Sequence, residues 1–389
     1  MKKFTLAILA IFILVCFTCC GKAEQVPTSA VTTDDTTEAA TTEATEDQDE
    51  AFSDSDSFKI GLILTEDDQG TKSKKGIQTA VNKINKSGEY KFEIVDTYND
   101  KNTYTYNDLL SEGVQFLISN TDNIIPAQEK PKNILHISLN DLSDKNTDNI
   151  LSLNDSSITP GKRIADYVSA KFPTEKIGTI YNSDSQSYTE QTENFHLGIQ
   201  QSKIQLAFSE GFSNKNAYDF TSQLIKAYNS DVKALVLFAS KDNCALIIEQ
   251  ADAMGYRPDF IGGEQLKGLI TLDNVNKKYI SNTHIVTEFS TNAQTSAEFV
   301  SLYKTAYGEK PDIDSALGYD SVYVIYEALK NAQIKKYSYS GEKLLKKIND
   351  KRDDFTFIGI TGESIKWDSN GKISRVSPSI LIEKGKYVK

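Results

Sequence analysis

The chain has 389 residues and a formal net charge of −11, and charged residues make up 25% of it. This length is enough for about two domains. The acidic excess lies in 23–57, which has eleven acidic residues and neither Lys nor Arg, so the sequence from 58 onward has a net charge of only −3. Nucleic-acid binding needs a basic surface, and this sequence has no basic run. We therefore exclude nucleic acid as a partner.

The N-terminus has the features of an export signal. Lys2 and Lys3 precede the apolar run FTLAILAIFILVCF, whose roughly 14 residues suit a signal peptide and are too few for a membrane-spanning helix. The run ends in FTCCGK, which is similar to the lipobox of bacterial lipoproteins. We predict a signal peptide over 1–20 and lipid modification of Cys20, with Cys19 as the alternative. An ordinary secretory signal without a lipid is the remaining possibility.

The segment that follows predicts a tether. Thr, Ala, Glu, Asp and Ser dominate it, and Phe52 is its one large apolar residue, so it cannot bury enough surface to fold. We predict that 21–57 is a disordered acidic tether between a lipid anchor and a globular body. Such a tether suits the extracellular face of a Gram-positive cell membrane.

The cysteines agree with an exported protein that has no disulfide. Of the four cysteines, only Cys244 lies in the body, and one thiol cannot form an internal disulfide. The body must therefore be stabilised by its hydrophobic core. No His or other base lies near Cys244, so we predict a small buried apolar residue and not a nucleophile.

Buried strands and amphipathic helices alternate from 58 onward. The run FKIGLIL at 58–64 predicts a strand, and 74–88 predicts a helix with one apolar stripe that ends at Gly88. Further strands are predicted at 91–96, 113–119, 133–138, 176–181, 204–212, 234–239 and 259–263, and further helices at 160–172, 219–231 and 243–255. This alternation predicts parallel sheets covered by helices on both faces, and the number of elements predicts two α/β domains.

Several motifs, taken in order, resemble the Leu/Ile/Val-binding family of solute-binding proteins, which serve ABC transporters. KIGTIYNSDSQSYTEQTENF stands where that family has a strand and a Tyr-Gly loop, and DFTSQLIKAYNSDVKALVLF resembles its Asp-Phe helix and next strand. ALGYDSVYVIYEALKNA is similar to its Tyr-Asp-Ala helix, and FIGITGESIKWDSNGKI resembles its C-terminal glycine signature, with Trp367 in place of Phe. The likeness covers almost all of 58–389.

The resemblance implies a type I periplasmic-binding-protein fold, which is α/β with two doubly wound parallel-sheet lobes joined by a three-crossing hinge. Lobe 1 would comprise 58–154 and 289–374, and lobe 2 would comprise 155–288 and 375–389. Ligands would bind between the lobes, outside the carboxyl ends of the strands, which agrees with the general rule for open α/β sheets. The implied protein is a monomer that delivers a small solute to an ABC permease; a receptor that signals to a membrane partner is the alternative.

The resemblance also implies ligand-binding residues in lobe 2. Glu264, which follows a strand and two glycines, falls on the acid that holds the ligand's ammonium group. A carboxylate in a closed cleft is costly unless a cation and hydrogen bonds compensate it. Tyr188 falls on the tyrosine whose ring lies against the ligand, and Ser240 at a strand end is a further expected contact. The alternatives are a solvated loop acid for Glu264 and a surface aromatic for Tyr188.

Lobe 1 departs from the family pattern, in which a Ser and a Thr hold the ligand's carboxylate. Both hydroxyl residues are missing, so we expect an amine-bearing small solute and do not specify a branched-chain amino acid. The residues at the corresponding positions are Asp122 or Asn123 for the Ser, Asn140 and Asp141 near the second contact, Leu142 for the Thr, and Gln69 for a side-wall Tyr.

The sequence does not predict an enzyme. The three histidines, His136, His196 and His284, are far apart and have neither metal-ligand nor triad spacing. His136 lies within a predicted strand, which favours a place in the core. We expect no metal and no cofactor.

Overall fold

The computed structural model describes residues 56–96, 98–99, 102–103, 106–121, 134–141, 150–155, 158–272, 276–277, 280–350 and 355–388. The predicted signal peptide, both candidate lipidation sites and nearly all of the predicted tether lie outside these residues. No helix in the described part is long and apolar enough to cross a membrane.

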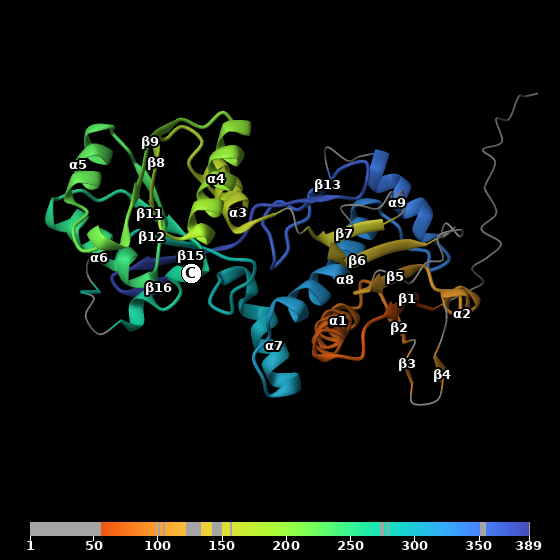
Figure 1. Cartoon of the computed structure of the whole chain (residues 1–389). Coiled ribbons are helices and arrows are strands. Elements are labelled where there is room, and N and C mark those ends of the chain that lie inside the picture. Colours follow the sequence, from red (N-terminus) through yellow and green to blue (C-terminus); the bar gives the residue numbers. More distant parts are fainter. Residues whose placement is uncertain are drawn as a thin grey trace, which may run out of the picture. The chain divides into compact units, whose positions relative to one another are not determined.

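The apolar runs of the N-terminal half form a parallel sheet with the strand order β2-β1-β5-β6-β7 among the described residues. Most of the buried side chains of its strands are apolar, and helices cover both faces of the sheet (Figure 1). The strands are β1 (Phe58–Ile63), β2 (Phe92–Asp96), β5 (Phe116–Ser119), β6 (Leu135–Asp141) and β7 (Ile150–Asn154). The short pairs β3 (Tyr98–Asn99) with β4 (Asn102–Thr103) and β13 (Lys366–Trp367) with β14 (Ile373–Ser374) lie outside this sheet.

The first helix has a capping residue at each end and one buried apolar face. The side chain of Asp67 accepts from the backbone N–H of Gly70 at its start, and Gly88 ends it in the left-handed conformation at φ 74°. The predicted apolar stripe is buried. The helices around the first sheet are α1 (Asp68–Ser87), α2 (Tyr106–Ser111), α7 (Ala297–Tyr307), α8 (Ile313–Asn331) and α9 (Gly341–Asp350).

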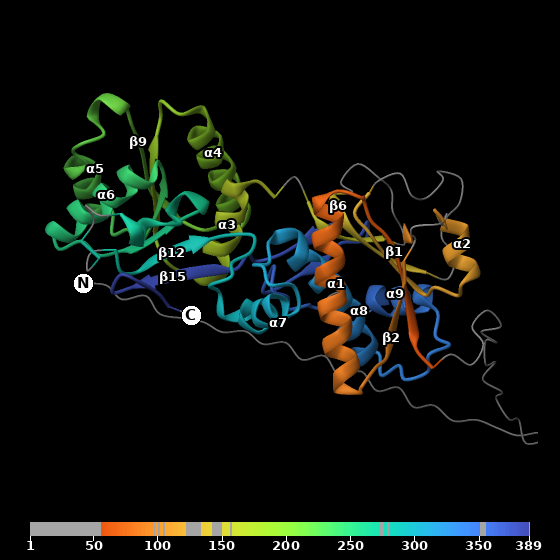
Figure 2. The same ribbon diagram turned by 90° about the horizontal axis from the view of Figure 1, so that it is seen from below.

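Helices α1 and α8 lie side by side because glycines let their backbones approach (Figure 2). A Cβ built on Gly76 would lie 1.9 Å from the carbonyl oxygen of Ser315, and one on Gly318 would lie 2.3 Å from that of Ser73. Any larger residue at either position would push the helices apart.

The C-terminal half forms a second sheet with the strand order β16-β15-β12-β11-β10-β8-β9 among the described residues. Neighbouring strands from β9 to β12 are parallel, whereas β15 and β16 are antiparallel to their neighbours. The strands are β8 (Ile177–Asn182), β9 (Leu206–Phe212), β10 (Ala234–Phe238), β11 (Asp259–Gly262), β12 (Thr283–Val286), β15 (Ser379–Glu383) and β16 (Lys386–Val388). The helices are α3 (Pro160–Lys171), α4 (Gln186–Gln201), α5 (Thr221–Asn229) and α6 (Lys241–Ala253).

The predicted fold class is confirmed. In the described part the chain passes between the two sheets after β7, after β12 and after β14. Cys244 is a free, fully buried thiol and His136 is a buried strand residue, as predicted. Strands β7, β12 and β16 and helices α2, α7 and α9 are among the elements that the sequence patterns did not identify. The exact lobe boundaries stay a prediction.

A buried aspartate fastens the segment that leads toward the third passage. Asp320 of α8 is fully buried, and its Oδ1 accepts from the Ile360 N–H at 3.0 Å. Its Oδ2 accepts from the N–H of Thr361 at 2.9 Å and from the Thr361 hydroxyl at 2.6 Å. Burial raises the pKa of Asp320 to about 6, against the opposing effect of these donors and of Arg375. Asp320 is therefore ionised at neutral pH, where both oxygens act as acceptors.

We predict that Asp320→Asn destabilises the protein. An amide has only one oxygen, so its NH2 group must face a backbone N–H in either orientation. An unmatched buried donor costs about 1–3 kcal/mol, and urea unfolding at pH 7 should show a loss of that size. Glu327→Gln, at a partly exposed position of the same helix, is the control and should change the unfolding free energy by about 0.5 kcal/mol or less. Equal stability of the two variants would contradict the role assigned to Asp320.

The body begins slightly before the predicted end of the tether. Ser57 is buried, and its hydroxyl donates to Glu93 Oε2 at 3.2 Å beside the first strand pair. A test of the tether must therefore leave Ser57 in place.

We predict that deleting 23–55 from the purified soluble protein leaves its melting temperature and ligand affinity unchanged. The deleted segment is acidic and has only one large apolar side chain, Phe52, so it has little to contribute to a core. Differential scanning calorimetry measures the first quantity and titration calorimetry the second. A loss of several degrees would show that the segment packs on the body.

Candidate functional site

A cavity of about 380 Å³ lies at the carboxyl edge of the second sheet. Its wall includes the first turns of α3 and α4 and the residues that follow β11. Glu264 and Tyr188, which are 76 positions apart in the sequence, both line this cavity. The structure therefore brings together the two lobe-2 residues for which the resemblance implies contact with the ligand's ammonium group and with its body.

Close packing between α3 and α4 creates one side of this cavity. A Cβ on Gly161 would lie 2.0 Å from the carbonyl oxygen of Gln191, and one on Gly198 would lie 2.5 Å from the Cβ of Ala165. The two contacts follow each other in the same direction along both helices, so α3 and α4 run parallel and side by side (Figure 2). Their N-termini consequently meet at the same edge of the sheet.

The paired glycines before Glu264 allow a tight turn out of β11. A Cβ on Gly262 would lie 2.5 Å from Leu266 Cδ1, so the missing side chain leaves room for Leu266 to fold back into the core, where it is fully buried. A short 3-10 turn, η2 (Glu264–Leu266), results. This turn directs the strand end into the core at Leu266 and leaves Glu264 at the surface of the cavity.

Glu264 is held in place by two neighbours. Its Oε1 accepts a hydrogen bond from the Thr287 hydroxyl, and its Oε2 forms an ion pair with the Lys267 ammonium group. The Glu264 side chain is still 55% exposed. It is therefore a positioned carboxylate at the rim of the cavity, although it is in contact with water.

Tyr188 presents a half-buried ring in the first turn of α4. Its backbone N–H donates to the hydroxyl of Ser185, which caps the helix, and its ring packs against the apolar core under α3 and α4. Burial raises the pKa of the Tyr188 hydroxyl, so the side chain is a neutral phenol at physiological pH. The ring supplies the cavity with an amphipathic wall.

A second cavity, of about 480 Å³, shares Glu264 with the first. It is also lined by Lys267 and Glu288, and by Pro311 and Asp312 just before α8. Glu264 therefore borders two hollows, and one of them includes residues attached to each of the two sheets. The acidic residues of its lining, Glu264, Glu288 and Asp312, outnumber its one basic residue, Lys267.

Arg163 is a site residue that the sequence analysis missed. It is only 8% exposed, and its Nη2 donates to Glu288 Oε1 and to the carbonyl oxygen of Ile158. Burial lowers the pKa of Arg163, whereas the charges of Glu288 and Glu264 act in the opposite direction. Lys267 and Thr287 were missed too. Lys267 follows Glu264 by one turn, and Thr287 directly follows β12. The closeness of both residues to a strand end could have marked them as site candidates.

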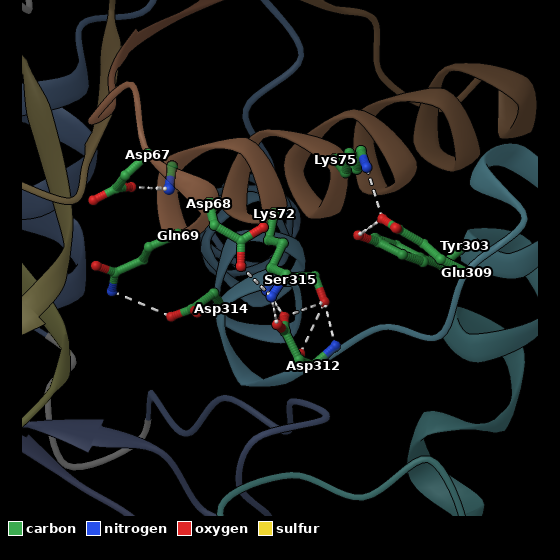
Figure 3. A network of polar contacts seen from close by, with 11 residues as sticks. Asp67, Asp68, Gln69, Lys72, Lys75, Tyr303, Glu309, Asp312, Asp314 and Ser315 are labelled. Carbon is green, nitrogen blue, oxygen red and sulfur yellow. Dashed lines mark hydrogen bonds and ion pairs between the residues drawn. The ribbon is translucent and has the colours of Figure 1, made fainter.

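Gln69 has a partner within its own lobe. It lies in the first turn of α1, and its Nε2 donates to Asp314 Oδ1 at 3.2 Å across the start of α8 (Figure 3). Nearby, Lys72 bridges Asp68 at 2.5 Å and Asp312 at 2.9 Å. Burial and the negative charge of Asp312 raise the pKa of Asp314. The first turns of α1 and α8 thus form an acidic group with an internal cation.

The remaining predicted site residues are placed as follows. Asn140 donates through its side chain to the carbonyl oxygen of Asn120 at 2.7 Å, and Asp141 ends β6 opposite Asn154. Ser240 caps α6 by accepting from the Asn243 N–H. Asp122 and Asn123 lie outside the described residues. The structure therefore places Glu264 and Tyr188 at one cavity. The ligand roles of these two residues stay predictions, and so do those of Asn140, Asp141, Ser240 and Gln69.

The described residues include no group of three or more His, Cys, Asp or Glu side chains that is arranged to hold a metal ion. Burial lowers the pKa of His136 to about 3 and raises that of Cys244 to about 12. At neutral pH His136 is therefore uncharged and Cys244 is a thiol.

Solved structures with a similar fold are numerous. A candidate branched-chain amino acid ABC transporter from Rhodospirillum rubrum has a TM-score of 0.55 and 14% identity, covering 85% of this chain and 98% of that one. LivJ from Streptococcus pneumoniae, a branched-chain amino acid substrate-binding protein in complex with isoleucine, has a TM-score of 0.41 and 23% identity, covering 85% and 97%. The leucine-binding protein LivK from Thermotoga maritima has a TM-score of 0.41 and 20% identity, with the same coverage.

At these identities the likeness supports the fold alone. This conclusion rests on the Rhodospirillum rubrum structure. No curated protein matches the sequence. The family model described as "Periplasmic binding protein" matches residues 59–376, which is most of the chain. The chain therefore belongs to the periplasmic binding protein family.

Proposed function

We propose that this protein captures a small amine-bearing, amino-acid-like solute between its two lobes and delivers it to an ABC permease. The observation that supports this function best is the position of Glu264. Its carboxylate lies at the carboxyl edge of a parallel sheet, is held by Thr287, and borders two cavities beside the ring of Tyr188. Ligands of open α/β sheets bind at this edge.

The contact between Lys267 and Glu264 supports a cationic ligand group. It is an ammonium–carboxylate pair at the cavity, so the surroundings of Glu264 already accommodate an ammonium group. Both side chains are partly exposed, and such a pair contributes little because water screens it. A ligand ammonium enclosed by a closing cleft would interact with Glu264 in a lower dielectric and therefore more strongly. The ligand can thus replace Lys267 at a net gain.

The proposed mechanism uses the three passages between the lobes as a hinge. Without ligand the open form is favoured, and a ligand that contacts both lobes favours the closed form by the difference between its affinities for the two forms. A permease that recognises the closed form would then receive loaded protein in preference to empty protein.

The proposal places the protein at the outer face of the cell membrane. The lipobox-like sequence FTCCGK favours attachment through a lipid on Cys20. The acidic segment 21–57 would then serve as a tether, because its like charges extend the chain. This arrangement would keep the body within reach of a permease in the same membrane.

We predict that Glu264→Gln weakens ligand binding about 30-fold or more, since losing one partner of a desolvated charge pair costs about 2–5 kcal/mol. The ligand is first identified by a thermal-shift screen of amino acids, amines and small peptides. Titration calorimetry then compares the variants. Tyr188→Ala should weaken binding less, because it removes packing without leaving a charge unpaired.

Glu193→Gln, an exposed position on α4, is the matched control and should bind like the unchanged protein. All variants should melt within a few degrees of one another. An affinity that Glu264→Gln does not alter would make this carboxylate a solvated loop residue.

We predict that Cys20→Ser releases the protein into the medium if Cys20 is the lipidated residue. Cys19→Ser is the control, and the double variant covers the alternative site. Palmitate labelling and fractionation of cells give the measurement. Continued labelling and membrane retention of the double variant would disprove the lipid anchor.

A further inference from the structure

We propose that the cavity between α3 and α4 binds the carboxylate of the ligand, so that lobe 2 alone recognises both charges of a free amino acid. The inference rests on the proposed function, in which Glu264 holds the ligand's ammonium group. It also accounts for the hydroxyl residues missing from lobe 1. The carboxylate subsite is assigned to the first turns of α3 and α4 together with Arg163.

Two helix N-termini meet at this cavity. Helix α3 has 12 residues and α4 has 16, and Pro160, Ser185 and Ser187 from their starts line the cavity. The cap hydroxyls of Thr159 and Ser185 accept the backbone N–H groups of Lys162 and Tyr188. The N–H groups that precede these have no acceptor within their helices. Such groups, with the positive ends of the helix dipoles, favour an anion.

Arg163 supplies an independent observation. More than nine-tenths of this residue is buried, yet it lines the cavity. Its recorded hydrogen bonds come from Nη2 alone, and Nε is buried without an acceptor among the described residues. A guanidinium group is a rigid fork of five donors that matches a carboxylate. Glu288 and Ile158 accept from Nη2 only, so Nη1, which has no acceptor among the described residues, is the donor left for a second anion.

The charge arrangement suits a zwitterion. Glu264, which contacts Lys267 and the buried Thr287, lines the cavity, and so do Arg163 and the first residues of α3 and α4. Glu264 and Arg163 are close enough for the Glu264 charge to affect the guanidinium. A free amino acid carries both complementary charges a few bonds apart. An amine without a carboxylate would leave the cationic half of the cavity unmatched.

The test pairs each of the common L-amino acids with its amide, for example L-leucine with L-leucinamide. The amide keeps the ammonium group and the side chain and loses only the negative charge. Titration calorimetry on the full mature protein should show that the amide of the best amino acid binds at least about tenfold more weakly, as expected for one lost charged contact.

Ser187→Asp is the sharpest variant, with Ser187→Asn as its neutral control. Ser187 is exposed in the first turn of α4 and lines the cavity. An acid in a first turn is favourable for the helix, so the melting temperature should not fall. The new negative charge should weaken binding of the amino acid about tenfold or more and leave the amide within about threefold. Ser187→Asn should preserve the preference for the acid.

Arg163→Gln and Glu288→Gln separate the subsite from a purely structural role of the ion pair. Both variants break the pair, but only Arg163→Gln removes the guanidinium group. The preference for the acid over the amide should disappear in Arg163→Gln and persist in Glu288→Gln. Loss of the preference for the acid in both variants would show that Arg163 acts through its ion pair with Glu288 and not through a contact with the ligand.

The outcomes also distinguish this inference from the proposed function. Equal binding of acid and amide by the unchanged protein, with both weakened by Glu264→Gln, would overturn the carboxylate subsite and leave the amine site standing. Preference for the acid that depends on Ser187 and Arg163 but not on Glu264 would overturn the amine site instead. Failure of every amino acid and amide to bind would overturn the inference, since it names free amino acids as the ligands.

Discussion

A strand in a parallel sheet must be followed by a connection that returns over the face of the sheet, because its neighbour begins at the opposite end. Here α4 makes that return between the parallel neighbours β8 and β9, whereas α3 follows the passage from the first sheet and leads into β8. The carboxyl ends of the strands and the amino ends of the helices are consequently brought to one edge. Glu264 lies at this edge after β11, Tyr188 lies there in the first turn of α4, and Arg163 lies there in the first turn of α3. The location of the candidate site is thus a result of chain direction.

The sequence predicted most of what depends on local pattern. The alternation of apolar runs and helical stripes identified the fold class, and the two glycines before Glu264 drew attention to a strand end that does line a cavity. The missed strands have weaker local signals. Strand β7 is a five-residue segment that contains Ser152 and Asn154, and β12 contains Thr283 and His284. Their burial comes from neighbouring strands that are distant in sequence.

Site residues that act through a partner were harder to predict. Arg163 lies in a helix whose pattern reads as an ordinary amphipathic face, and its partner Glu288 is 125 positions away. Nothing within a short window shows that these two side chains meet. Thr287 and Lys267 are different, because each is close to a strand end or to Glu264 in the sequence. For these two residues the missing information was orientation, which depends on the turn at η2 and on the end of β12.

Two buried charges lie at or near the passages between the sheets. Arg375, which is 5% exposed, donates through Nη1 to the carbonyl oxygen of Leu153, and Asp320 accepts from Ile360 and Thr361. Buried charges tolerate few alternative geometries, because an unmatched partner is costly. Movement of the lobes would therefore be confined to the few backbone torsions that leave these contacts intact.

The ion pair between Lys267 and Glu264 gives ligand capture the character of an exchange. The two residues are three positions apart, so the lysine ammonium group is present at a high effective concentration near the carboxylate at all times. Under the proposed function, an arriving ammonium group would replace one positive charge by another, and the lysine would return to water. The electrostatic free energy of capture would thus be only the difference between a contact enclosed by the cleft and the solvent-screened contact with Lys267. Amines that offer nothing beyond their charge would gain little over the resident lysine, and the remaining parts of a solute would have to distinguish it.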